Sequence, residues 1–230
     1  MESMVAKDRL PPTSPLRAPR AGAVAGILFA VLLIASIALL RLSVPADPLD
    51  TGTWLAARAG WVALALNLVP FAGIAFLWFI GVLRDRLGAA EDRFFATVFL
   101  GSGLLFLAML FVSAAAAGGL IITYAAAPRE LLGSPSFTVI RAVMYVVMNV
   151  YAVKMAGVFM IVTSTLAIRT GFIRRWIAIF GYVLALLLLL SSGAFAEILL
   201  VFPLWVFLVS VYILIDNRRQ PATVTATDSR

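Results

Sequence analysis

Long apolar runs separated by short polar segments dominate this chain. An α-helix crosses the ~30 Å hydrocarbon core of a bilayer with about 20 apolar residues, and lipid admits only segments whose backbone groups are hydrogen-bonded internally. Of the 230 residues, 63% are hydrophobic, against roughly 45–50% in soluble domains, which is more apolar surface than a soluble core can bury. The six runs predict an all-α fold, a polytopic transmembrane bundle of six helices.

The predicted transmembrane domain covers residues 21–216, between a disordered tail at 1–20 and a polar tail at 217–230. The first run is longer than the roughly 7–15 apolar residues of a signal peptide, and Arg41 follows it directly, so we expect an uncleaved span. The six predicted spans are residues 21–40, 61–83, 94–123, 138–168, 176–192 and 195–215.

The distribution of basic residues predicts the orientation of the chain. Thirteen of the eighteen Lys and Arg residues lie in the two tails and in the even-numbered connections, whereas three lie in the odd-numbered ones. Because short cytoplasmic segments are enriched in Lys and Arg, both termini are predicted to be cytoplasmic. Two lysines against sixteen arginines, with abundant alanine, suggest a bacterial cytoplasmic membrane.

Composition excludes several kinds of chemistry. The chain has no histidine and no cysteine, which removes histidine-ligated haem, histidine-based metal sites, thiol nucleophiles and disulfides. Every aspartate lies outside the predicted spans, so a pair of intramembrane aspartates is also excluded. We therefore expect no catalytic residue, no metal site and no cofactor, and the sequence favours a non-enzymatic protein. The basic clusters lie between apolar runs, where they set topology, so nucleic acid is not an expected partner.

The fourth predicted span carries Arg141, Tyr145, Asn149 and Lys154, whereas the other runs hold no lysine, arginine, aspartate or glutamate well inside them. This span is ~46 Å long as a helix, so Arg141 is expected at the outer interface as an anchor. Lys154 lies ~20 Å further along the helix axis than Arg141. At 100° per residue, its side chain points ~220° around the axis from that of Arg141. A charge at that depth costs roughly 2.5–3.5 kcal/mol on insertion scales, which marks Lys154 as the residue that needs a partner.

Two hypotheses account for these polar groups. In the first, a polar pocket opens to the outer side and is lined by Lys154, Asn149, Tyr145, Asn67 and Glu197, where Pro70 frees a backbone carbonyl beside Asn67. In the second, Lys154 extends toward the interface, Arg141 and Glu197 form an interfacial ion pair, and Asn149 bonds another helix.

Two resemblances add to this interpretation. The segment GVLRDRLG (81–88) resembles the cytosolic loop signature of major facilitator transporters, which implies a transporter-like half-unit that works as a homodimer. The whole chain looks like a family of bacterial six-span membrane proteins without an assigned function, on residues 84–106, 148–161 and 200–214. The latter resemblance implies location and topology, and it supplies no catalytic residues.

The sequence therefore favours an integral membrane protein that handles a small molecule or a lipid through a polar pocket near Lys154. The alternative is a structural or accessory subunit of a membrane complex, for which we expect a dry interior and an apolar or glycine-rich face for partners. The GxxxG spacing of Gly22 and Gly26 permits another helix to approach closely. Expected partners are membrane lipids, a second copy of the chain or other membrane subunits.

Overall fold

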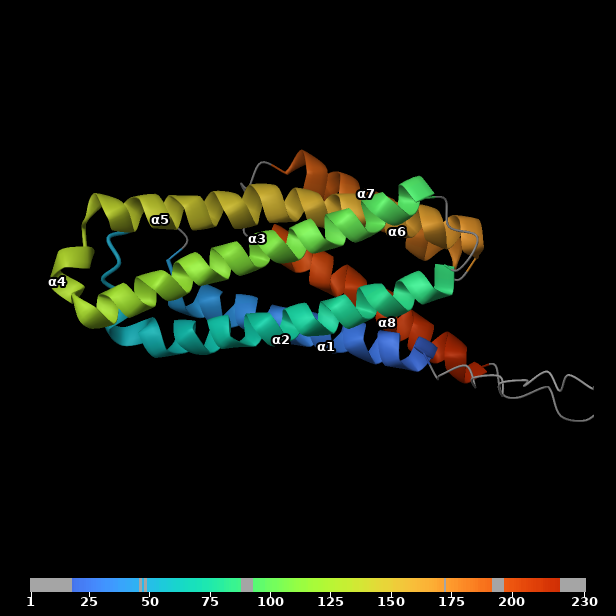
Figure 1. Ribbon diagram of the computed structural model, residues 1–230, viewed down its shortest axis with the longest axis horizontal. Coiled ribbons are helices and arrows are strands. Elements are labelled where there is room, and N and C mark those ends of the chain that lie inside the picture. Colours follow the sequence, from blue (N-terminus) through green and yellow to red (C-terminus); the bar gives the residue numbers. More distant parts are fainter. Residues whose placement is uncertain are drawn as a thin grey trace, which may run out of the picture.

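The structure is a computed structural model that describes residues 18–45, 47, 49–87, 93–171, 173–191 and 197–219. These residues form long helices that lie side by side in one elongated bundle (Figure 1). The helices are α1 (Ala18–Ser43), α2 (Leu55–Leu87), α3 (Arg93–Ala126), α4 (Pro128–Leu131), α5 (Pro135–Val146), η2 (Val147–Ala152), α6 (Val153–Thr170), α7 (Arg175–Leu190) and α8 (Ile198–Arg219).

The prediction of an all-α membrane bundle is confirmed. Within the described part of the chain, five helices are long and apolar enough to cross a membrane, and α5, η2 and α6 together form one of them. The predicted fifth span corresponds to α7, which has only 16 residues. The helices also extend further than predicted, since α2 already begins at Leu55 and continues to Leu87, beyond the start of the predicted loop.

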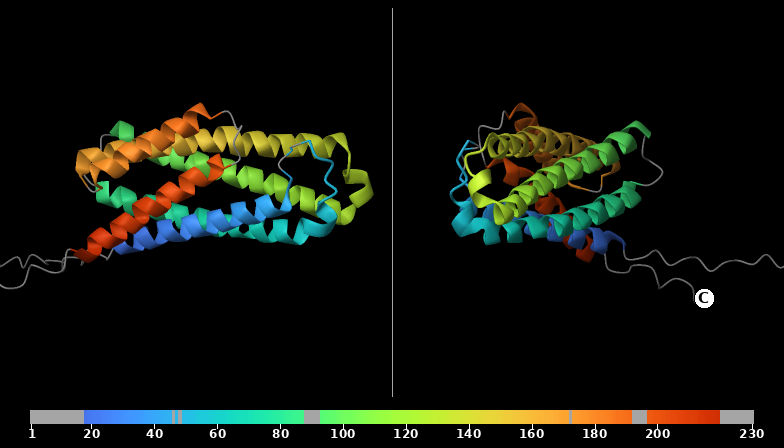
Figure 2. Two further views of the ribbon diagram at one scale, coloured as in Figure 1. Left: turned by 180° about the vertical axis from the view of Figure 1, so that it is seen from behind. Right: turned by 60° about the vertical axis from the view of Figure 1, so that its left-hand side comes forward.

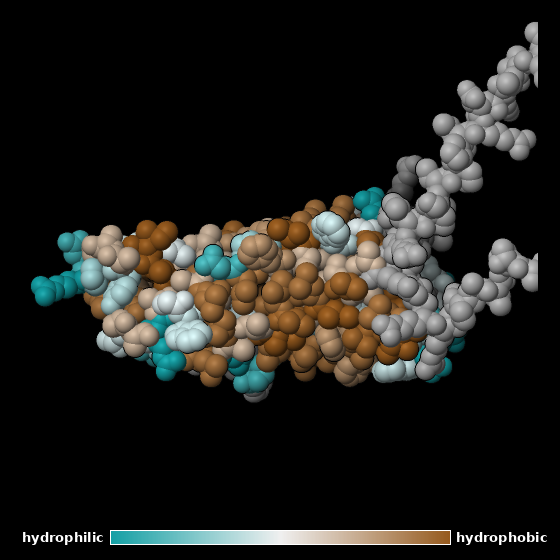
Figure 3. All heavy atoms as spheres, turned by 90° about the horizontal axis from the view of Figure 1, so that it is seen from below, coloured by the Kyte–Doolittle hydropathy of each residue, from teal (hydrophilic) through white to brown (hydrophobic). Residues whose placement is uncertain are grey.

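The bundle has two unlike ends. α1 begins and α8 ends at one of them, here called the proximal end, whereas the loop between α1 and α2 and the short helix α4 form the distal end (Figure 1). The hairpin of α7 and α8 starts at the proximal end and turns back part of the way along the bundle, as both views of Figure 2 show. On the face that Figure 3 shows, hydrophobic side chains cover the middle of the molecule and give way to more polar residues toward the distal end.

Glycines bring α1 close to its neighbours. A Cβ atom on Gly22 would collide with Val82 of α2, and one on Gly26 would collide with Ser210 of α8 and Phe79 of α2. The close approach expected from the GxxxG spacing is thus confirmed, because only hydrogen at these Cα atoms leaves room for the two neighbouring helices.

Phenylalanine side chains fill the centre of the bundle. The ring of Phe76 lies 4.6 Å from Phe29, 5.6 Å from Phe202 and 5.3 Å from Phe159, as measured between ring centroids. These rings come from four different helices, and tilted and edge-on pairs of this kind add to the energy of apolar burial. The complete cluster of buried rings is Phe29, Phe76, Phe79, Phe99, Phe106, Phe159 and Phe202.

The fourth long helix changes its winding in the middle, at η2, where six residues form a π-helix. A π turn holds one residue more than an α turn, so the residues beyond it are rotated by about 100° relative to a continuous α-helix. Lys154 therefore points ~120° from Arg141 rather than the ~220° expected at a constant 100° per residue. The prediction of a uniform α-helix through this span is wrong at η2.

Side-chain donors satisfy two backbone carbonyls directly before the π-helix. Ser113 of α3 donates to the carbonyl oxygen of Met144 at 3.3 Å, and the amide Nδ2 of Asn149 donates to that of Tyr145 at 3.0 Å. Since a π-helix displaces the regular i→i−4 pattern, these donors stabilise the change of winding at this position.

Candidate functional site

Lys154 binds the C-terminal end of α7. Its Nζ donates to the carbonyl oxygen of Leu189 at 2.7 Å and to that of Ser191 at 3.4 Å. The last carbonyls of a helix have no partner within the helix, and they carry the negative end of its dipole. A half-buried ammonium group at this point therefore neutralises backbone acceptors that lipid cannot satisfy. These contacts explain why the chain places a charge at this depth.

Asn149 and Tyr145 lie one turn apart on the same helix. Asn149 is 8% exposed, and its amide bonds the Tyr145 backbone rather than a side chain of another helix. Tyr145 is 36% exposed at the edge of the bundle. The pair thus connects the end of α5 with η2 and supports the geometry of the π turn.

The other two predicted pocket residues lie on separate elements. Asn67 is exposed on α2, and its Nδ2 donates to the carbonyl oxygen of Ala63 in its own helix at 2.9 Å. The Glu197 side chain is 77% exposed, and its Oε1 lies 3.4 Å from Nη1 of Arg41. Hydrogen bonds therefore connect Asn149 with Tyr145, whereas Lys154, Asn67 and Glu197 each bind a different partner.

Arg141 is buried against the loop between α1 and α2. Its Nη2 donates to the carbonyl oxygens of Asp47 at 2.9 Å and Pro45 at 3.2 Å. Its Nη1 lies 3.6 Å from Oδ1 of Asp50. With 8% of its surface exposed, the guanidinium holds this loop onto α5. The ion pair of Arg141 with Glu197 considered from the sequence is replaced by Arg141 with Asp50 and Arg41 with Glu197.

Aromatic rings complete the surroundings of Arg141. Its guanidinium carbon lies 5.7 Å from the ring centroid of Trp54 and 5.9 Å from that of Phe137. Both residues belong to a second, smaller apolar cluster at the distal end, whose buried members are Leu55, Leu120, Leu131 and Phe137. Burial of an arginine is tolerated here because carbonyls, a carboxylate and ring faces surround it.

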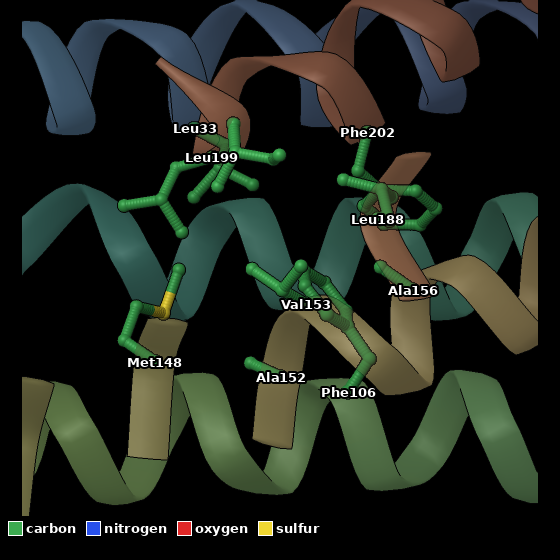
Figure 4. A pocket seen from close by; sticks show the side chains of 10 residues that line it. Leu33, Phe106, Met148, Ala152, Val153, Ala156, Leu188, Leu199 and Phe202 are labelled. Atoms are coloured by element: carbon green, nitrogen blue, oxygen red, sulfur yellow. The ribbon is translucent and has the colours of Figure 1, made fainter. Parts of the chain in front are cut away.

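A small apolar cavity lies where α8 begins (Figure 4). Its volume of about 10 Å³ is room for about one water molecule, and its walls come from α1, α3, η2, α6, α7 and α8. The five predicted pocket residues are absent from its lining, although Val153 beside Lys154 contributes to it. The lining residues are Leu33, Phe106, Met148, Ala152, Val153, Ala156, Leu188, Ile198, Leu199 and Phe202.

The structure shows a contact of charged side chains that the sequence does not predict, between Arg41 at the end of the first span and Glu197. Arg41 is 31% exposed and contacts Glu197 through Nη1, yet its Nη2 is buried and has no hydrogen-bond partner within the described ranges. Arg58 donates to the carbonyl oxygen of Leu42, the next residue of α1, at 3.3 Å. The sequence shows the two arginines at the ends of adjacent helices, but only the fold brings Glu197 to Arg41.

Comparison with protein-family models, with curated proteins and with solved structures finds no match to this chain. The fold and the contacts above define it as a helical integral membrane protein. The two family resemblances stay predictions.

Proposed function

We propose that this protein is a structural or accessory subunit of a membrane complex, which acts through helix–helix contacts rather than by passing a solute through its interior. The observation that carries the proposal is the close-packed centre, where seven buried phenylalanine rings from five helices meet. A carrier needs a site large enough for its substrate, and pockets for small ligands are typically about 300–1,000 Å³, whereas the cavity at the start of α8 is about 10 Å³.

The contacts of Lys154 support this proposal. A polar pocket was inferred because the charge needed a partner, and the backbone of α7 supplies two acceptors. Once those carbonyls are assigned to Lys154, its depth in the bundle requires no ligand.

The outward face of α3 supports the proposal as well. Of the most apolar 18 residues of α3, 28% are buried within the bundle, against 44–50% in the other four long helices. Small residues recur along this face of α3 at intervals of seven or four residues, which place them on one side of the helix. These residues are Gly101, Ala108, Ala115 and Gly119. A Cβ on Gly101 or Gly119 would meet no heavy atom within 4 Å. Such faces let transmembrane helices pack closely, so the expected partner is a helix of another membrane subunit.

The test is extraction of the tagged chain from its native membrane in lipid nanodiscs, followed by mass determination of the intact particle. We expect a stoichiometric complex that Gly119→Leu disperses, because the added side chain separates the two helices. Gly60→Leu is the matched control, since Gly60 is exposed on α2 and its Cβ also has open space. A single unassociated chain in every preparation, or solute flux through liposomes that hold the purified protein, would contradict the proposal.

The orientation belongs to the same proposal. Thirteen Lys and Arg residues in the tails and even-numbered connections support cytoplasmic termini in a cytoplasmic membrane. A fluorescent protein fused after Arg230 is expected to fluoresce, whereas a periplasmic phosphatase fused there is expected to be inactive. The reverse pattern would overturn the orientation without affecting the accessory role.

A further inference from the structure

The junction of α1 with the start of α8 combines an incompletely hydrogen-bonded arginine with the small apolar cavity of Figure 4, here called the crevice. Arg41 makes a single contact of 3.4 Å with the exposed carboxylate of Glu197. Its second terminal nitrogen is buried without a hydrogen-bond partner in the part of the chain that the structure describes. A guanidinium presents five donors, and leaving a buried one unpaired is unfavourable. The Arg41 side chain is 31% exposed and its contact of 3.4 Å with Glu197 is long for a hydrogen bond, so the exposed part of the guanidinium can bind a stronger acceptor from the membrane.

A second cation lies at the same turn of α1. Arg58 is exposed and donates to the carbonyl oxygen of Leu42 at 3.3 Å, so its guanidinium lies against the backbone of the residue that follows Arg41. Trp61 is one helical turn further along α2 and is 54% exposed. Tryptophan together with arginine is typical of the level of lipid headgroups. Arg41, Arg58 and Glu197 together carry a net charge of +1, which is complementary to one anion.

The apolar part of the site lies directly below these charges. Glu197 is followed at once by Ile198 and Leu199, and both line the cavity of Figure 4. Leu33 lines its other side from α1, ~12 Å along the helix axis from Arg41. The cavity is partly open, because Leu199 and Met148 are only half-buried. α8 packs extensively on α1 but only sparsely on α6 and α7, and the side of α8 toward these two helices is here called the seam.

We propose that this junction binds one anionic phospholipid of the surrounding membrane. Its phosphate lies between Arg41 and Arg58, and one of its acyl chains runs along the seam beside α8 and covers the crevice at Leu199. A pocket for the chain is not needed, because the lipid lies against the outside of the bundle and its chain only covers the opening of the cavity. This inference concerns the isolated protein and does not depend on the proposed partner subunit.

The experiment measures retained lipid and thermal unfolding of the purified, delipidated full-length protein in detergent. Phosphatidylglycerol and phosphatidylcholine with identical acyl chains are added in parallel, and inorganic phosphate serves as the headgroup without a chain. We expect one phosphatidylglycerol retained in native mass spectra and a rise of several degrees in the unfolding midpoint. Phosphatidylcholine is expected to bind at least ten-fold more weakly, and inorganic phosphate is expected to give no shift.

Variants separate the two halves of the site. Arg41→Gln and Arg58→Gln are each expected to weaken phosphatidylglycerol binding about ten-fold, whereas Arg129→Gln, at an exposed arginine of α4, is the matched control and is expected to bind as the wild type does. Leu199→Trp fills the crevice and is expected to weaken binding with the charges unchanged. If Arg41→Gln does not fold, Arg58→Gln decides the question, because Arg58 is exposed. Equal binding of the two lipids, an equal shift with inorganic phosphate, or unchanged binding in Arg58→Gln would each overturn the proposal.

Discussion

Single side chains in this bundle act mainly on backbone groups that lipid would leave unsatisfied. Lys154 binds the end of α7, Arg141 binds carbonyls of the loop between α1 and α2, and Asn149 binds a carbonyl before η2. The hydropathy of the sequence identified all three residues as exceptional, because charged and amide groups inside apolar runs need partners. Their partners were not predictable, since Asp47 lies 94 residues from Arg141 and Leu189 lies 35 from Lys154.

Replacement of Lys154 tests the assignment of this residue as a cap. Lys154→Met keeps the length of the side chain and removes the donor to Leu189 and Ser191, so we expect a loss of about 1.5–3 kcal/mol in the free energy of unfolding, as for a hydrogen bond to a charged group. Lys154→Arg keeps donors and charge, and it is expected to retain most of the stability. Unfolding in detergent, followed by tryptophan fluorescence, measures both. Wild-type stability of Lys154→Met would contradict the assignment.

Gly181 gives a second test at the same scale. A Cβ on this glycine of α7 would collide with Ser164 and would lie 2.9 Å from Nε1 of Trp205. Both neighbours are buried, so we expect Gly181→Ala to destabilise the protein by about 1–3 kcal/mol, as overpacking does. Gly60→Ala is the control, because its Cβ has open space and alanine favours the helix by roughly 0.5–1 kcal/mol. Equal unfolding midpoints for the two variants would show that α7 is not tightly packed here.

At the scale of elements, the number and approximate place of the apolar helices followed from the sequence, whereas their winding and length did not. Apolar runs indicate which residues contact lipid or the core of the bundle. The same residues are compatible with an α turn or a π turn, so the pattern does not predict η2. One of the donors that stabilise the π turn is Ser113, which lies on a different helix. The short α7 (Arg175–Leu190) lies within two residues of the predicted span 176–192 at each end, whereas the contact of its last carbonyls with Lys154 was not predicted. The sequence identified the individual polar residues of the candidate site but not which residues they contact. Hydropathy indicates how deep a residue lies in the membrane, and it does not indicate which residues of other helices lie beside it.

Single-residue deletions test the π segment. Deleting Val150 removes the extra residue of η2, so the remaining helix can wind as a regular α-helix while both halves keep their buried faces. Deleting Val158 in α6 rotates the neighbouring residues by about 100° and turns buried side chains such as Phe159 toward lipid. We expect the first variant to stay monodisperse by fluorescence-detected size-exclusion chromatography and the second to aggregate. Similar behaviour of the two would mean that η2 does not act as an insertion.

At the scale of the whole molecule, two apolar clusters divide the bundle along its length. The larger one contains the phenylalanine rings and lies where α1, α2, α3, α6 and α8 meet. The smaller one holds the distal ends of α2, α3 and α5 together beside Arg141. Since α7 and α8 stop part of the way along the bundle (Figure 2), the larger cluster has to supply most of the packing that unites all the long helices.

Phe76 tests that dependence because its ring is fully buried and contacts five other rings. Phe76→Ala leaves a cavity that the surrounding helices cannot close completely, so we expect a loss of about 3–5 kcal/mol in the free energy of unfolding. Phe71→Ala on the same helix is the matched control, since Phe71 is 62% exposed and its truncation removes mainly contacts with lipid or detergent. Denaturation of both variants in the same detergent measures the difference. Equal losses would mean that the aromatic cluster does not unite the bundle, and they would weaken the argument for a protein with a closed interior.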